Sequence, residues 1–104
     1  MSQTSQQAVG IHCDYQPEVD LLYAWIGGPE AAENIEVEPG IFVRVSPATR
    51  SVVGIEVLDC AARFHLDPKT VDVRFAESLI ERYRAAALEE FAKTNPPTLF
   101  SSEQ

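Results

Sequence analysis

Apolar and polar residues alternate along much of the chain between Tyr15 and Asp59, a pattern typical of strands in an antiparallel sheet. This alternation turns one row of side chains toward a core and the other toward water. The strands that it predicts span residues 11–15, 20–26, 35–38, 42–45 and 53–57. We therefore expect an antiparallel β-meander of four to five strands within residues 11–58.

The second predicted strand, 20–26, differs from the others because both of its faces are apolar. One face carries Leu21, Tyr23 and Trp25, and the other carries Leu22, Ala24 and Ile26. A strand of this kind is covered on both sides. Our candidate interface residues are Leu22, Tyr23, Trp25 and Ile26.

Beyond Asp59 the spacing of apolar residues changes from that of a strand to that of a helix. Residues 60–64 are expected to form one helical turn, with Asp59 as its N-cap. Residues 73–93 are expected to form a long C-terminal helix, starting after Asp72 or, alternatively, at Asp67-Pro68. Its expected buried stripe comprises Ala76, Leu79, Ile80, Tyr83, Ala87, Leu88 and Phe91.

The turn at Pro39-Gly40 bears on the register of the hairpin around it. A two-residue loop would place Glu36 beside Val43, with apolar and charged side chains on one face. A three-residue loop over 39–41 would keep the apolar residues together and pair Glu36 with Arg44. The apolar face favours the three-residue loop.

Composition supports one small α+β domain. The chain has 104 residues, of which 45% are hydrophobic, enough for one modest core. We expect a disordered N-terminal tail at residues 1–10, a single domain over 11–93 and a C-terminal tail at 94–104. Within that last tail, Leu99 and Phe100 either dock on the domain or stay free.

Several short motifs resemble the bacterial domain-of-unknown-function 2283 family. They are Tyr15, Pro17, Glu18, Asp20, Leu22 and Tyr23, then Glu38-Pro39-Gly40-Ile41, then Val53-Gly54-Ile55-Glu56 and Leu58-Asp59. The resemblance covers roughly residues 12–62. It implies a compact β-meander in small bacterial proteins, with no catalytic residues to carry over.

Net charge is −8, and most of it lies in the first part of the chain. Residues 1–43 contain seven acidic residues and no basic one. Such a surface repels phosphate backbones, so we expect no nucleic-acid partner, whereas a basic protein partner would be attracted. No apolar run approaches a membrane span, so no membrane partner is expected. The N-terminus lacks the features of a secretory signal, which makes the cytoplasm the expected compartment.

Few residues in the sequence suggest a metal-binding or catalytic site. His12, Cys13, Cys60 and His65 have zinc-ligand side chains, but their spacing fits no standard zinc pattern. Two groups of carboxylates invite a comparison with cation or acid–base sites: Asp14, Glu18 and Asp20, and Glu36, Glu38 and Glu56. We interpret the first as a turn capped by Asp20 and the second as a solvated face. No metal, cofactor or catalytic residue is expected.

Three functional hypotheses remain. The first is a non-catalytic protein-interaction module that forms a homodimer, because one helix can cover only one face of a sheet. The second is an antitoxin-like or regulatory binder of a basic protein. The third is a small hydrolase or metalloprotein, which the residues support least.

Overall fold

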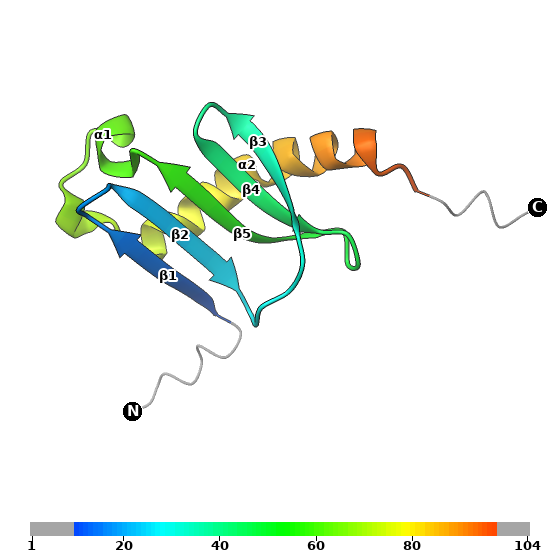
Figure 1. Cartoon of the computed structure of the whole chain (residues 1–104), viewed down its shortest axis with the longest axis horizontal. Coiled ribbons are helices and arrows are strands. Elements are labelled where there is room, and N and C mark those ends of the chain that lie inside the picture. The colour runs from blue at the N-terminus through cyan, green and yellow to red at the C-terminus, as the bar shows by residue number, and fades with distance from the viewer. Residues whose placement is uncertain (1–9, 98–104) are drawn as a thin grey trace, which may run out of the picture.

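The computed structural model describes residues 10–97, which form a five-stranded antiparallel sheet with a long helix packed against it (Figure 1). The strands are β1 (Ile11–Gln16), β2 (Leu21–Ile26), β3 (Glu33–Glu38), β4 (Ile41–Ser46) and β5 (Ser51–Leu58). The helices are α1 (Cys60–Phe64), the 3-10 turn η2 (Pro68–Thr70) and α2 (Val73–Thr94). The α+β fold predicted from the sequence is confirmed.

The strands lie in the order β1-β2-β5-β4-β3. β1 and β2 form one hairpin, and β3, β4 and β5 follow one another as neighbours. The connection between β2 and β3 carries the chain past β5 and β4 to the far edge of the sheet (Figure 1). β5 then returns to pair with β2, which joins the two parts of the sheet into one.

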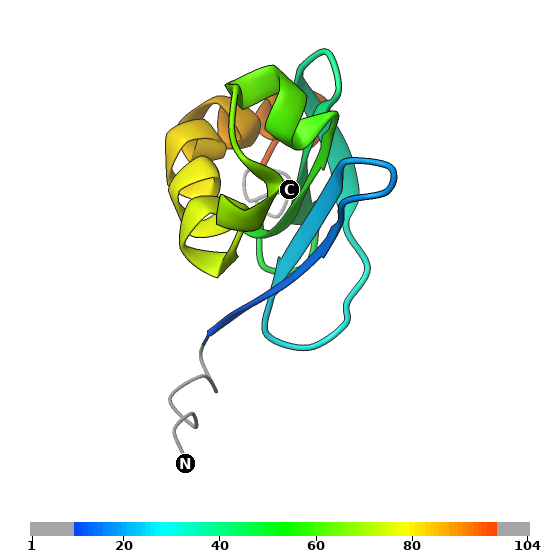
Figure 2. The same cartoon turned by 90° about the vertical axis from the view of Figure 1, so that its left-hand side faces the viewer.

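The core lies between α2 and one face of the sheet (Figure 2). Buried sheet residues on that face are Leu22, Ala24, Ile41, Val43, Val45, Val52, Ile55 and Val57. From α2 the buried residues are Ala76, Leu79, Ile80, Tyr83, Ala87 and Phe91. The helical stripe read from the sequence therefore faces the sheet, with Leu88 partly buried at its margin.

α2 begins where the sequence predicted. The side chain of Asp72 accepts a hydrogen bond of 3.0 Å from the backbone N–H of Phe75, as an N-cap does. Asp67, the rival start, caps the short η2 turn instead. At the other end, the side chain of Asn95 donates to Glu33 on β3. Within residues 10–97, no helix combines the length and apolar character needed to cross a membrane.

The β3–β4 register differs from the prediction. Ile35 pairs with Val43, but Glu36 pairs with Phe42 and not with Arg44. The loop is the two-residue Pro39-Gly40 turn, and a bulge at Val37 shifts the register by one residue. Because of the bulge, the apolar residues stay on one face although the loop has only two residues. The prediction assumed strict alternation along the strand, which leaves no place for an extra residue. The Glu36 carboxylate instead accepts from the backbone N–H of Gly40 at 3.1 Å.

The cap of α1 also differs from the prediction. Asp59 has a left-handed backbone and makes no side-chain cap. The carboxylate of Asp20, in the turn between β1 and β2, accepts from the backbone N–H groups of Ala61 and Ala62 at 2.7 and 3.0 Å. Asp20, predicted to cap the backbone of its own turn, thus caps a distant helix instead.

Tyr15 completes this cap, since its hydroxyl donates to Asp20 at 2.6 Å. Hydrogen bonds to the Asp20 carboxylate hold its pKa below the usual range. The bond from Tyr15 contributes most, and the bonds from the backbone N–H groups of Ala61 and Ala62 add to it. The same bond is the main reason that the pKa of Tyr15 rises to about 12. The pair ties the β1–β2 turn to the segment that follows β5.

The predicted tails fall mainly on residues 1–9 and 98–104, which lie outside the described residues. Leu99 and Phe100 belong to this group. Residues 94–97 are described, and α2 runs one residue further than expected, to Thr94.

We expect Ile80→Asp to lower the free energy of unfolding by about 2–5 kcal/mol, because it buries an unpaired carboxylate. Ile80 is 1% exposed. Ala86→Asp introduces the same side chain at an exposed position of α2 and should cost far less. Urea unfolding measures both; equal losses would contradict the packing of α2.

We expect Asp20→Asn to lower stability by about 1–2 kcal/mol at neutral pH, since charge-assisted hydrogen bonds are lost from a carboxylate partly open to solvent. Asp59→Asn is the control and should change stability little, because its side chain makes no cap.

The contribution of Asp20 should also depend on pH. Its pKa is lowered in the folded chain, so its stabilisation is present above the unfolded pKa of about 4 and is lost as the pH falls through the folded value. Urea unfolding of wild type and Asp20→Asn at several acidic pH values should show the two curves converging. A gap that persists at pH values below the folded pKa of Asp20 would contradict the role of the carboxylate.

Candidate functional site

The sheet face opposite α2 carries no helix within the described residues, and we call it the open face (Figure 2). The four interface candidates divide between the two faces. Leu22 is fully buried beneath the helix, and Ile26 packs against the same core. Tyr23 and Trp25 lie on the open face, half-buried. They are the two candidates left with access to a partner.

Aromatic rings form a row across β1 and β2 on the open face. The ring of Trp25 stacks on His12 at a centroid distance of 5.4 Å and on Tyr23 at 5.2 Å. His12 and Trp25 are direct cross-strand partners, which explains their contact. The row presents a flat, partly exposed aromatic surface.

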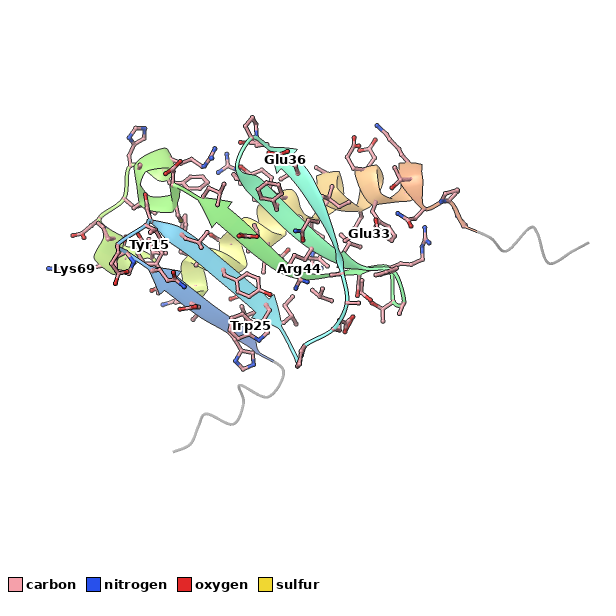
Figure 3. The ribbon with its side chains drawn as sticks, in the orientation of Figure 1. Tyr15, Trp25, Glu33, Glu36, Arg44 and Lys69 are labelled. Atoms are coloured by element: carbon pink, nitrogen blue, oxygen red, sulfur yellow. The ribbon has the colours of Figure 1, made fainter. Side chains whose placement is uncertain are left out.

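Arg44 reaches this row from β4 (Figure 3). Its Nη1 donates to the hydroxyl of Tyr23 at 3.0 Å, and its Cζ lies 5.9 Å from the centre of that ring. Across residues 10–97 the only ion pairs join Glu81 to Arg84 and Glu90 to Lys93, both on α2. The half-buried Arg44 guanidinium therefore has no carboxylate partner within this part of the chain.

Gly54 makes the approach of Arg44 and Trp25 possible. It lies between them in the sheet, opposite Trp25 on one side and Arg44 on the other. A Cβ at this position would lie 2.8 Å from the backbone oxygen of Ala24 and 3.5 Å from Arg44 Cδ. The sequence motif Val53-Gly54-Ile55-Glu56 contained this glycine, and a glycine inside a strand signals a close backbone approach.

A hollow of about 390 Å³ opens between the aromatic row and the connection that follows β2. Its lining residues are Tyr23, Trp25, Gly28, Pro29, Glu30, Arg44 and Val53. A shallower hollow of about 370 Å³ adjoins it over Asp14 and Glu56 and shares Tyr23 and Arg44. Sequence reasoning did not single out Arg44 or Pro29 as site residues, because their proximity to Trp25 depends on the strand order.

The four zinc-type side chains do not form a cluster. Within residues 10–97, no group of three or more His, Cys, Asp or Glu side chains is arranged to hold a metal ion. His12 stacks on the open face, whereas Cys13 packs toward the core and Cys60 is buried. His65 is exposed at the end of α1.

The environment of both cysteines disfavours the thiolate. Burial, and then the charge of Asp20, raises the pKa of Cys60 to about 11. Burial also raises the pKa of Cys13, with a further contribution from Asp72. The thiolate is the reactive form of cysteine, so these side chains are arranged for packing.

Three of the carboxylates likewise have separate partners. Asp20 caps α1, and Glu38 accepts from the hydroxyl of Tyr83 at 3.1 Å. Glu36 holds the Pro39-Gly40 turn, and Glu56 lines the open face. The site therefore offers a stacking surface and the Arg44 guanidinium, which has no carboxylate partner among residues 10–97, with acidic groups around them.

Residues 12–60 match the protein family described as "Protein of unknown function (DUF2283)", which confirms the resemblance read from the sequence. The matched segment contains β1 from its second residue onward, all of β2 to β5, and Tyr15 and Asp20, and it ends at the first residue of α1. No curated protein and no solved structure matches the chain. The family assignment thus describes a shared domain and assigns no activity.

We expect Gly54→Ala to destabilise the chain by about 1–3 kcal/mol, because the added methyl group forces β2 and β5 apart beside Trp25. Gly28→Ala is the control, since a Cβ there meets nothing within 4 Å. Thermal or urea unfolding measures the two changes. A neutral Gly54→Ala variant would contradict the close pairing of these strands.

Proposed function

Residues 12–60 of this chain belong to a domain family of unknown function, and we propose that the chain is a non-catalytic protein-interaction module that pairs with a second copy of itself through the open face. The observation that carries the proposal is the one-sided sheet. α2 covers one face, and the other presents half-buried apolar and aromatic side chains.

The centre of the open face resembles the core of an interface. Tyr23, Trp25 and Val53 lie next to one another around Arg44. Aromatic residues and arginine are the residue types enriched at the centres of protein interfaces. Tyr23 and Trp25 are only half-buried, so a second copy would remove their remaining apolar surface from water.

Charge on the open face is compatible with self-pairing. Arg44 lies near the middle, while the carboxylates of Asp14, Glu30 and Glu56 line the two hollows beside it. In a two-fold pair each protomer supplies the same patch, so an Arg44 from one copy can meet a carboxylate from the other. Such an arrangement would give the unpaired guanidinium a partner.

The distribution of reactive groups supports a non-catalytic role. General acid–base or nucleophilic catalysis needs a base within hydrogen-bonding reach of the group that it activates. Among residues 10–97, the thiols are packed into the core and Asp20 is committed to a cap. The aromatic groups on the open face stack on one another, and Arg44 donates to one of them.

A second candidate is a regulatory, antitoxin-like binder of a basic protein. The observation that favours it is the acidic surface: seven acidic residues and no basic one precede Arg44. Acidic side chains around an aromatic centre suit a basic surface, and complementary charge mainly speeds such an association. A basic protein bound at low salt and released at high salt would favour this reading over self-pairing.

Sedimentation equilibrium at micromolar concentration should show a species of twice 11.5 kDa. Trp25→Gln should raise the dissociation constant of the pair at least about tenfold, as loss of a central aromatic residue does. Val73→Gln makes a similar change at an exposed position of α2 and should leave pairing intact.

Circular dichroism establishes that each variant is folded. Arg44→Glu provides a second test on the same face if Trp25→Gln is unstable. A single species of 11.5 kDa over the whole concentration range would overturn the self-pairing proposal.

A further inference from the structure

The hollow beside Trp25 has the size and lining of a small-ligand site. Its volume of about 390 Å³ falls within the range of about 300–1,000 Å³ typical of such sites. The sheet provides one wall, and the connection after β2 provides the other, with Gly28 and Pro29. The lining is largely apolar with a few charged groups, the composition that small-molecule sites share.

The walls favour a planar ring. Trp25 and Tyr23 stack at an interplanar angle of 26° and together form a broad aromatic surface. Pro29 and Val53 add compact apolar surface around the same space. A planar aromatic ring placed there would gain both offset stacking and apolar burial.

Arg44 favours a carboxylate in the same ligand. One of its five N–H donors is used by Tyr23, and no carboxylate pairs with it within the described residues. The guanidinium fork matches a carboxylate in a bidentate geometry. Tyr23 holds the guanidinium in place, so little ordering is required when an anion arrives.

Glu30 adds the opposite charge at the rim of the hollow. It lines the hollow together with Arg44, yet the two form no ion pair. A ligand with only a carboxylate would be repelled by Glu30, and one with only an ammonium group would be repelled by Arg44. A ligand that carries both groups satisfies both residues.

We propose that this hollow binds a zwitterionic α-amino acid with an aromatic side chain. The ring stacks on Trp25, the carboxylate pairs with Arg44 and the ammonium group faces Glu30. This inference concerns a small ligand. It uses the same Tyr23, Trp25 and Arg44 as the proposed pairing of two copies, so the ligand and a second copy compete for the open face.

Isothermal titration calorimetry of the full chain with L-phenylalanine and L-tryptophan tests the proposal. Three probes each lack one feature: alanine lacks the ring, phenethylamine lacks the carboxylate and phenylpropionate lacks the ammonium group. We expect both aromatic amino acids to bind and each incomplete probe to bind more weakly.

Single substitutions test the contributions of Arg44 and Glu30 to binding separately. Arg44→Gln should weaken binding at least about tenfold, because a charge-assisted bidentate contact is lost. Glu30→Gln should weaken it by about two- to fivefold, since Glu30 is exposed. Arg84→Gln and Glu89→Gln remove the same charges from α2 and serve as controls that should bind as wild type does.

The result that would overturn the proposal is the absence of binding by wild type at millimolar amino acid, or equal binding by wild type and Arg44→Gln. Phenethylamine binding as tightly as L-phenylalanine would also overturn it. Sedimentation of the chain without amino acid keeps the two proposals apart, because the ligand and a second copy would use the same residues. A dimer that binds no amino acid contradicts only this inference, whereas a monomer that binds one contradicts only the self-pairing proposal.

Discussion

The constraint on which the rest of this structure depends is that one helix can cover only one face of a sheet. α2 places its buried stripe on the face formed by residues such as Leu22, Val43 and Ile55. Burial of those side chains supplies the apolar contribution to stability. The opposite face must then be polar or carry a function, and here it carries an aromatic row around an arginine.

Asp20 links the two ends of the sheet segment. Its carboxylate accepts hydrogen bonds from the Tyr15 hydroxyl and from two backbone N–H groups at the start of α1. Those N–H groups have no partner within the helix, because they belong to its first turn. This cap fixes the direction in which the chain leaves β5. The family match spans residues 12–60 and so includes both Tyr15 and Asp20 with the first residue of α1.

The open face depends on two departures from a regular sheet. Gly54 removes a side chain where β2 and β4 approach β5, so Trp25 and Arg44 lie near each other over it. The connection after β2 crosses to the far edge of the sheet (Figure 1). Within it, Pro29 and Glu30 line the same hollow as Trp25 and Arg44. Together these two departures create a hollow with an aromatic wall and with two opposite charges, Arg44 and Glu30, that form no ion pair among residues 10–97, and both proposals rest on this hollow.

The sequence by itself determined the elements with strong periodicity. The strands, the Asp72 cap and the buried stripe of α2 follow from local spacing, because alternation and helical repeat depend only on near neighbours. It also limited the kinds of site that could be expected, because the spacing of the cysteines, histidines and carboxylates matches no standard metal-binding or catalytic motif.

Only the tertiary structure decided the features that join distant residues. The Asp20 carboxylate meets a backbone group 41 residues away, so no local pattern distinguished it from Asp59 as the cap of α1. The Val37 bulge let a two-residue turn keep its apolar face, which broke the predicted pairing of Glu36 with Arg44. The strand order brought Arg44 to Tyr23 and placed Leu22 under α2, because pairing between separated strands follows the packing of the whole core.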